Sequence, residues 1–217
     1  VVKVFRRFSG ANVFTTEFIP APSLNDILEM QQQFPRQLQA WYESNEISLK
    51  KVGRRLLESY LRQLCEEPEF DRHHVLLLRK NRIALVGIRS ARSLHRSFRS
   101  TYAMFLLSMA RGDSAKAADC LFLLCDSLPP IDLTEAKREV AAALRNYSAR
   151  VRLFPAQPDE KSLCQLFREI LLVLERHQIH VGWQFLDVQL GWSKLDESLR
   201  LAIPEENMLK RIQGYFE

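Results

Sequence analysis

The stretch VLLLRKNRIALV at residues 75–86 decides the fold, because it contains the clearest β-hairpin of the chain. Four apolar residues stand on each side of the polar turn Arg79-Lys80-Asn81-Arg82. Two short apolar runs that are bounded by turn residues are typical of short, buried strands. The pattern therefore predicts one small internal hairpin in a chain whose other segments mostly follow helical spacing.

Helical spacing dominates on both sides of this hairpin. Apolar residues recur at intervals of three and four, and Ser23, Gly112 and Pro204 suit helix ends. The expected helices span residues 23–34, 47–67, 94–110, 114–128, 133–151, 161–178, 181–201 and 205–215. Residues 1–19 are rich in β-branched and aromatic residues and predict two short strands around a turn at Ser9-Gly10. The predicted fold class is mainly α.

Composition restricts the class of protein. The 217 residues are 47% hydrophobic and 26% charged, which suits a globular core rather than intrinsic disorder. No apolar run approaches the roughly 18 residues that a membrane-spanning helix needs. We therefore expect a cytoplasmic protein, whose contact with a membrane would be peripheral.

The charge is unevenly distributed. The net charge of +5 is too mild to indicate nucleic acid as a partner. Residues 72–112, however, contain nine Lys and Arg residues and neither Asp nor Glu. Such a block predicts a positive face that attracts phosphate, an anionic membrane surface or an acidic protein partner. The alternative is a solvated face that acidic residues from elsewhere in the fold balance.

Several stretches resemble one family. They are VFTTEFIP (13–20), LLESYLRQL (56–64), NRIALV (81–86), RGD (111–113) and the segment 183–216. Together they resemble the UbiB/AarF family of atypical kinases. The resemblance implies the C-terminal lobe of a protein-kinase-like fold over residues 1–217, as a single domain. Hinge strands would occupy 1–22, the catalytic-loop region 23–92 and a helical part 93–217.

The motifs that carry the family's chemistry are altered. The family writes H-x-D-P-H-P-G-N in its catalytic loop and D-F-G after the following hairpin. Here the second motif reads Gly87-Ile88-Arg89, so Gly87 stands where the magnesium-binding Asp is expected. The first reads FDRHHV at residues 70–75. With a two-residue deletion after His74, Asp71 aligns with the catalytic Asp and His73 with the second His. Without a gap, His74 occupies the Asn position, where it could contact a metal.

The resemblance also assigns roles in nucleotide and anion binding. Glu17, Phe18 and Ile19 correspond to the hinge that would contact a nucleotide. Arg89 and Arg92 would lie on the phosphate side and are candidates for anion binding without magnesium. We expect no cofactor, and ATP with magnesium only if the lost motif residues are compensated. The chain starts at Val1, next to the hinge-like stretch, so we expect a piece that lacks the N-terminal lobe.

Three functions remain open from the sequence. The first is a pseudokinase with a binding or regulatory role, which the resemblance links to quinone or isoprenoid-lipid metabolism. The second is an active atypical kinase or ATPase within a longer parent chain, using Asp71 with His73 or His74. The third is a protein–protein adaptor that uses the basic face of residues 72–112. The oligomeric state is open as well.

Overall fold

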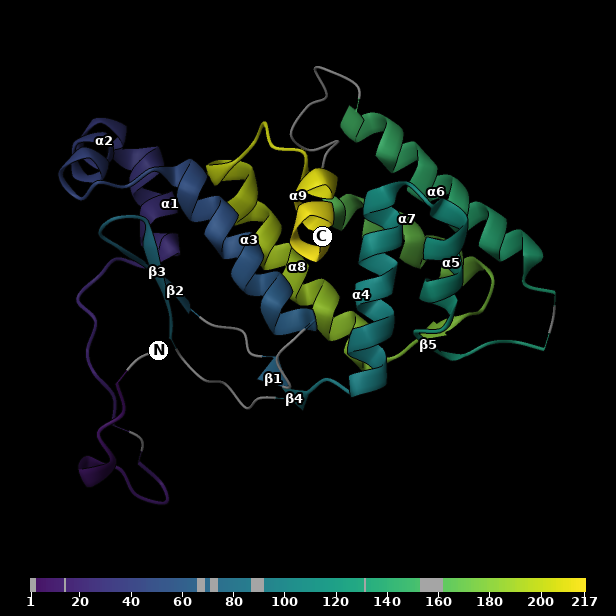
Figure 1. The fold of residues 1–217 in the computed structure, drawn as a ribbon, viewed down its shortest axis with the longest axis horizontal. Coiled ribbons are helices and arrows are strands. Elements are labelled where there is room, and N and C mark those ends of the chain that lie inside the picture. The colour runs from purple at the N-terminus through teal and green to yellow at the C-terminus, as the bar shows by residue number, and fades with distance from the viewer. Residues whose placement is uncertain are drawn as a thin grey trace. The chain divides into compact units, whose positions relative to one another are not determined.

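The computed structural model describes residues 3–13, 15–65, 69–70, 74–86, 92–130, 132–152 and 162–217. Most of these residues are helical, which confirms the predicted mainly-α fold (Figure 1). The chain divides into two compact units. Unit 1 is Val1–Leu56 with Asp71–Ala91, and unit 2 is Leu57–Phe70 with Arg92–Glu217. The division into 1–22, 23–92 and 93–217 stays a prediction.

Unit 1 combines helices with one regular hairpin. Its elements are η1 (Arg6–Phe8), α1 (Leu24–Gln33), α2 (Pro35–Ser44), the first half of α3 (Leu49–Cys65), β2 (His74–Leu78) and β3 (Arg82–Val86). Ser23 caps α1 as predicted, because its hydroxyl accepts from the Asp26 N–H and the Asp26 carboxylate accepts from the Ser23 N–H. Helix α2 was not predicted. Pro35 is the first residue of this helix, because proline fits the first helical position, where its missing N–H is not needed.

The two N-terminal segments of unit 1 pair less extensively than the sequence indicates. Among the described residues, Val4 and Thr16 form an isolated antiparallel bridge. The Phe5 N–H donates to the Thr15 carbonyl at 2.9 Å, and the Glu17 N–H donates to the Lys3 carbonyl at 2.8 Å. The short helix η1 interrupts the first segment, so the pairing predicted for residues 1–19 is real but brief.

The hairpin of β2 and β3 is regular along its whole length. It pairs five residues from His74↔Val86 to Leu78↔Arg82. Lys80 and Asn81 both have positive φ, at 60° and 59°, which is the type I′ turn that matches the twist of paired strands. Leu77 is 1% exposed and belongs to the core of unit 1, together with Ile27, Leu38, Tyr42 and Val52. The hairpin predicted at residues 75–86 is therefore confirmed.

The turn of this hairpin is fixed to the start of α3 by one asparagine. The Ser48 N–H donates to Asn81 Oδ1 at 2.5 Å. Arg55 Nη1 donates to the Asn81 carbonyl at 2.8 Å. Asn81 also tolerates positive φ better than most residues do, because its short polar side chain stabilises that conformation locally.

Replacing Asn81 should destabilise unit 1. Asn81→Ala loses the hydrogen bond from Ser48 and places a Cβ without polar compensation at positive φ, so the free energy of unfolding should fall by about 2 kcal/mol. Asn81→Gly loses the same bond without the conformational penalty and should cost about half as much. Urea denaturation measures both. Equal losses in the two variants would contradict this account of the turn.

Unit 2 is a helical body with short strand pairs. Its complete elements are β1 (Glu69–Phe70), β4 (Arg92–Ser93), α4 (Arg96–Arg111), α5 (Ser114–Phe122), β5 (Cys125–Ser127), α6 (Thr134–Arg152), α7 (Leu163–Arg176), β6 (His180–Val181), α8 (Trp183–Ala202) and α9 (Met208–Phe216). Gly112 ends α4 at φ 82°, and Asp113 caps α5, as a turn between two helices requires. The helix predicted to continue to Leu128 is wrong at its end, because Cys125–Ser127 pairs with β6.

An aromatic cluster forms the core of unit 2. The Trp192 indole N–H donates to the Tyr102 hydroxyl at 2.8 Å, and both residues are at most 1% exposed. Phe105 and Phe185 pack against Tyr102, and Phe167 packs against Trp192, in tilted and edge-on arrangements. Burial raises the pKa of the Tyr102 phenol well above its usual value, so the hydroxyl stays protonated as a hydrogen-bond partner. Trp183, the first residue of α8, is 42% exposed.

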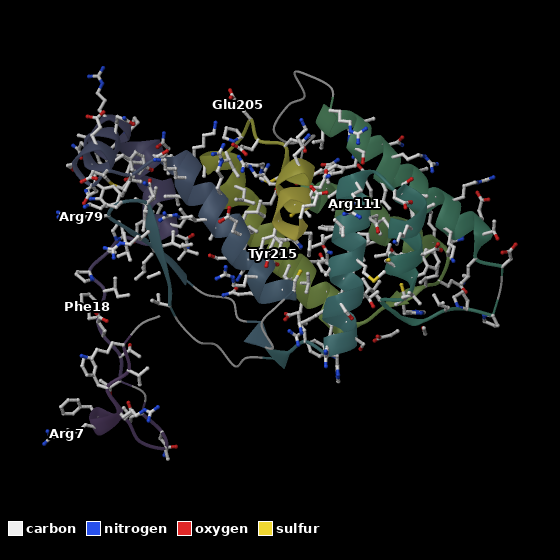
Figure 2. All side chains as sticks on the ribbon, viewed as in Figure 1. Arg7, Phe18, Arg79, Arg111, Glu205 and Tyr215 are labelled. Carbon is white, nitrogen blue, oxygen red and sulfur yellow. The ribbon has the colours of Figure 1, made fainter. Side chains whose placement is uncertain are left out.

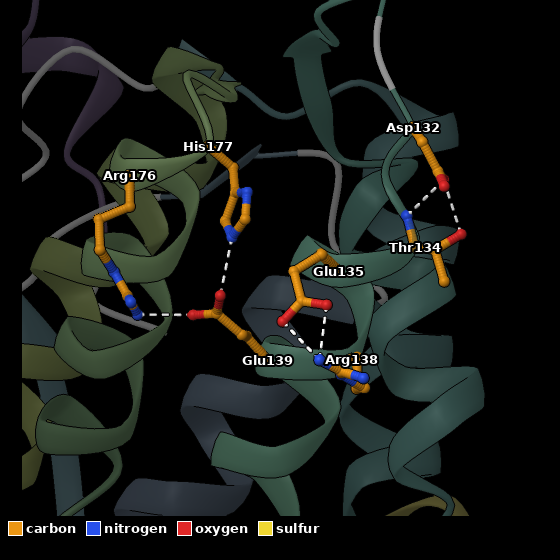
Figure 3. A network of polar contacts seen from close by, with 7 residues as sticks. All are labelled: Asp132, Thr134, Glu135, Arg138, Glu139, Arg176 and His177. Atoms are coloured by element: carbon orange, nitrogen blue, oxygen red, sulfur yellow. Dashed lines mark hydrogen bonds and ion pairs between the residues drawn. The ribbon is translucent and has the colours of Figure 1, made fainter.

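A polar network joins α6 to the end of α7 (Figure 3). Glu139 lies 2.9 Å from His177 Nε2 and 2.7 Å from Arg176 Nη2. The hydrogen bond with His177, together with the Arg176 charge, lowers the pKa of the Glu139 carboxyl. On the same helix, Glu135 pairs with Arg138 three residues later, with both side chains largely exposed.

Acid should weaken unit 2 through Glu139. A carboxyl with a lowered pKa in the folded state stabilises it above the ordinary pKa of about 4.5, and this stabilisation is lost as the pH falls through the lowered value. Glu139→Gln should therefore lower the melting temperature at pH 7 and flatten its decline below about pH 4.5. The control Glu135→Gln removes an exposed pair on one helix, worth a few tenths of a kcal/mol, and should change little. Identical pH profiles for wild type and Glu139→Gln would contradict this assignment.

Candidate functional site

In sequence, the regular hairpin lies between the two altered motifs. The pair His74↔Val86 ends the ladder of β2 and β3. In sequence, Asp71 and His73 come shortly before this pair, and Gly87 follows it directly. Asp71, His73, Gly87 and Arg89 lie outside the described residues, as does the side chain of His74. The backbone of His74 is nevertheless fixed next to the residue that precedes the altered D-F-G motif.

A second, shorter ladder lies in unit 2 and pairs the residues just before Asp71 with those just after Ala91 in sequence. Phe70, which precedes Asp71, pairs with Arg92, and Glu69 pairs with Ser93. Arg92 is the first residue of β4. The structure describes its backbone, and its role in anion binding stays a prediction.

The hinge-like residues follow the bridge between Val4 and Thr16. The Glu17 N–H is used by the Lys3 carbonyl, whereas the Phe18 and Ile19 N–H groups have no hydrogen-bond partner among the described residues. The Phe18 side chain is 85% exposed (Figure 2). The nucleotide-binding role of Glu17, Phe18 and Ile19 stays a prediction.

The hinge segment is also tied to the hairpin, a contact that no sequence pattern predicts. The Leu77 N–H donates to the Pro22 carbonyl at 2.9 Å, and Ser23 forms a bridge with Leu76. Both residues belong to unit 1. Backbone pairing within unit 1 therefore links the segment after the hinge-like residues to strand β2.

The residue that follows β3 lacks a side-chain donor for magnesium. Magnesium prefers carboxylate oxygens, and the residue after β3 is Gly87, which has no side-chain donor. Within the ranges that the structure describes, no three His, Cys, Asp or Glu side chains are grouped so that they could hold a metal ion. Gly87 therefore cannot supply the carboxylate with which a kinase holds magnesium at this position. Asp71, His73 and the side chain of His74 lie outside the described residues, so the absence of a metal stays a prediction.

Leu77 and Phe18 should respond in opposite ways to truncation. Leu77→Ala removes a fully buried side chain and should lower the free energy of unfolding by about 2–5 kcal/mol. Phe18→Ala should change it by less than about 0.5 kcal/mol, because the ring is exposed. Thermal and urea denaturation measure both. A large loss of stability in Phe18→Ala would show that the hinge-like stretch is packed rather than available to a ligand.

Comparison with protein families identifies the class. A family model described as the ABC1 atypical kinase-like domain matches residues 1–121. The match contains the hinge-like stretch, the β2–β3 hairpin and α4, and the chain belongs to this family, as the sequence resemblance predicts. Comparisons with curated proteins and with solved structures gave no match. The likeness of residues 183–216 to the family's last helices lies beyond the matched region and stays a prediction.

Proposed function

We propose that this chain is a pseudokinase-type domain of the ABC1 family that binds and regulates rather than transfers phosphate. The observation that carries the proposal is Gly87, the residue that directly follows the paired end of β3 and replaces the magnesium-binding Asp of the family. The Gly-Asn end of the catalytic-loop motif is missing too. Phosphoryl transfer depends on positioning and on metal charge, so losing these donors removes its main support.

The hinge supports binding of a nucleotide or a similar heterocycle. Phe18 and Ile19 present successive N–H groups without partners in the described part of the chain. The side chain of Phe18 is free to cover an aromatic ring. Glu17 contributes less, because its N–H is already bonded to the Lys3 carbonyl. In this proposal, Phe18 and Ile19 hold the base.

Arginine would replace magnesium as the counter-charge for the phosphates. Arg89 takes the last position of the altered D-F-G motif, and Arg92 follows at the start of β4. Guanidinium groups bind phosphate oxygens through planar pairs of hydrogen bonds, but they cannot coordinate as a metal does. The domain would therefore respond to a nucleotide without turning it over.

The biological setting in the proposal follows from the family resemblance. It is quinone or isoprenoid-lipid metabolism, with the domain in the cytoplasm and in peripheral contact with an anionic membrane. None of the helices within the described residues is both long enough and apolar enough to cross a bilayer. The basic block of residues 72–112 supports contact with an anionic surface.

A thermal-shift titration with ATP tests the proposal. Stabilisation by ATP alone, unchanged by magnesium, is expected, and at 100 times the dissociation constant it corresponds to about 2.7 kcal/mol. The double variant Arg89→Gln, Arg92→Gln should raise the dissociation constant for ATP about tenfold or more. Gly87→Asp should introduce a magnesium requirement, whereas the control Gly214→Asp, at an open position of α9, should not.

Two results would contradict the proposal. A wild-type shift that requires magnesium would favour the active kinase or ATPase that uses Asp71 with His73 or His74. No shift under either condition would remove the nucleotide from the proposal and leave the adaptor role.

A further inference from the structure

Unit 1 carries a basic feature that is distinct from the hinge and from Arg89 and Arg92, and that overlaps the basic block of residues 72–112 at the β2–β3 turn. It consists of five exposed cations on the first half of α3 and on the β2–β3 turn. They are Lys51, Arg55, Arg79, Lys80 and Arg82, here called the turn surface. Lys51 and Arg55 lie one helical turn apart, and Arg55 reaches the turn directly through the Asn81 carbonyl at 2.8 Å. The five side chains therefore gather around one point of the fold.

The arginines of the turn surface are held in place by uncharged partners. Arg79 Nε donates to Asn45 Oδ1 at 2.9 Å, and Arg82 Nε lies 3.4 Å from the Arg79 carbonyl. The Lys80 N–H donates to the Asn45 carbonyl at 3.0 Å. Each arginine keeps further N–H groups that these bonds do not use. The arginine side chains of the turn surface are thus held in position by hydrogen bonds that leave their positive charges unpaired in the described ranges.

No carboxylate compensates the charge locally. In the described ranges, none of the five side chains forms an ion pair. The acids of the adjoining α2 and loop are Glu43, which accepts a hydrogen bond from Gln39, and Glu46. On α3 itself, the exposed Glu58 lies three residues after Arg55. Five cations against these three acids leave an excess of positive charge.

We propose that the turn surface docks an acidic segment of a partner protein. Oriented guanidinium groups match the planar geometry of carboxylates. Among the residues from 35 to 86 whose burial is described, no large apolar side chain is exposed. A membrane site normally adds apolar anchors, and a site for single-stranded nucleic acid adds exposed aromatic rings. The turn surface has neither, so a carboxylate-rich peptide is the ligand that its chemistry fits. This inference does not depend on the proposed nucleotide site.

The test uses a fluorescein-labelled peptide of about ten glutamates and fluorescence anisotropy with the whole chain. Binding should be measurable at about 25 mM salt and should weaken strongly at about 150 mM, because exposed charges are screened. The triple variant Lys51→Gln, Lys80→Gln, Arg82→Gln should lose about tenfold or more in affinity. The double variant Lys51→Gln, Lys80→Gln keeps the hydrogen-bonded arginines and should lose less affinity for the peptide. Because this variant removes no hydrogen bond of the arginines, its loss reports on binding rather than on folding.

The matched control removes the same charge from unit 2. It is Arg145→Gln, Arg168→Gln, Lys210→Gln, all exposed and without ion pairs in the described part of the chain. This control should change affinity less than about threefold. Equal losses in both triple variants would show that net charge alone binds the peptide and would overturn the proposal. Tighter, turn-dependent binding of phosphatidylserine vesicles or of single-stranded RNA would overturn it as well, and so would no peptide binding.

Discussion

The antiparallel pairing of β2 with β3 is the constraint on which the account of the site depends. Its five residue pairs fix the backbone of His74 beside that of Val86, and so set where each altered motif meets the ladder. Leu77 anchors the hairpin in the core of unit 1 and ties it to the hinge segment through the Pro22 carbonyl. The type I′ turn at the other end is held by Asn81.

None of these interactions requires a catalytic carboxylate. Backbone pairing, burial of Leu77 and the bond from Ser48 to Asn81 persist whether residue 87 is Asp or Gly. A chain can therefore belong to the family without being catalytically competent. The match over residues 1–121 identifies the fold, whereas catalysis depends on the side chains at the site. The proposed exchange of metal donors for arginine depends on this separation of family membership from catalysis.

Local sequence signals predicted the elements that local chemistry determines. The hairpin followed from its turn, α1 from the Ser23 cap, and the end of α4 from Gly112. Elements that depend on distant partners were missed: Cys125–Ser127 becomes a strand because β6 lies beside it. The same limit applies to the candidate site. The sequence named Glu17, Phe18 and Ile19, but the bond from Leu77 to Pro22 emerges from tertiary packing.

Phosphate release from ATP by the purified chain, with and without magnesium, tests the central claim most directly. The account predicts no turnover above background under either condition, and no change in Asp71→Ala, because Gly87 and the missing Asn leave the metal without its donors. Magnesium-dependent phosphate release that Asp71→Ala abolishes would contradict it. In that case the chain would be an active member of its family, and the arginines would need another explanation.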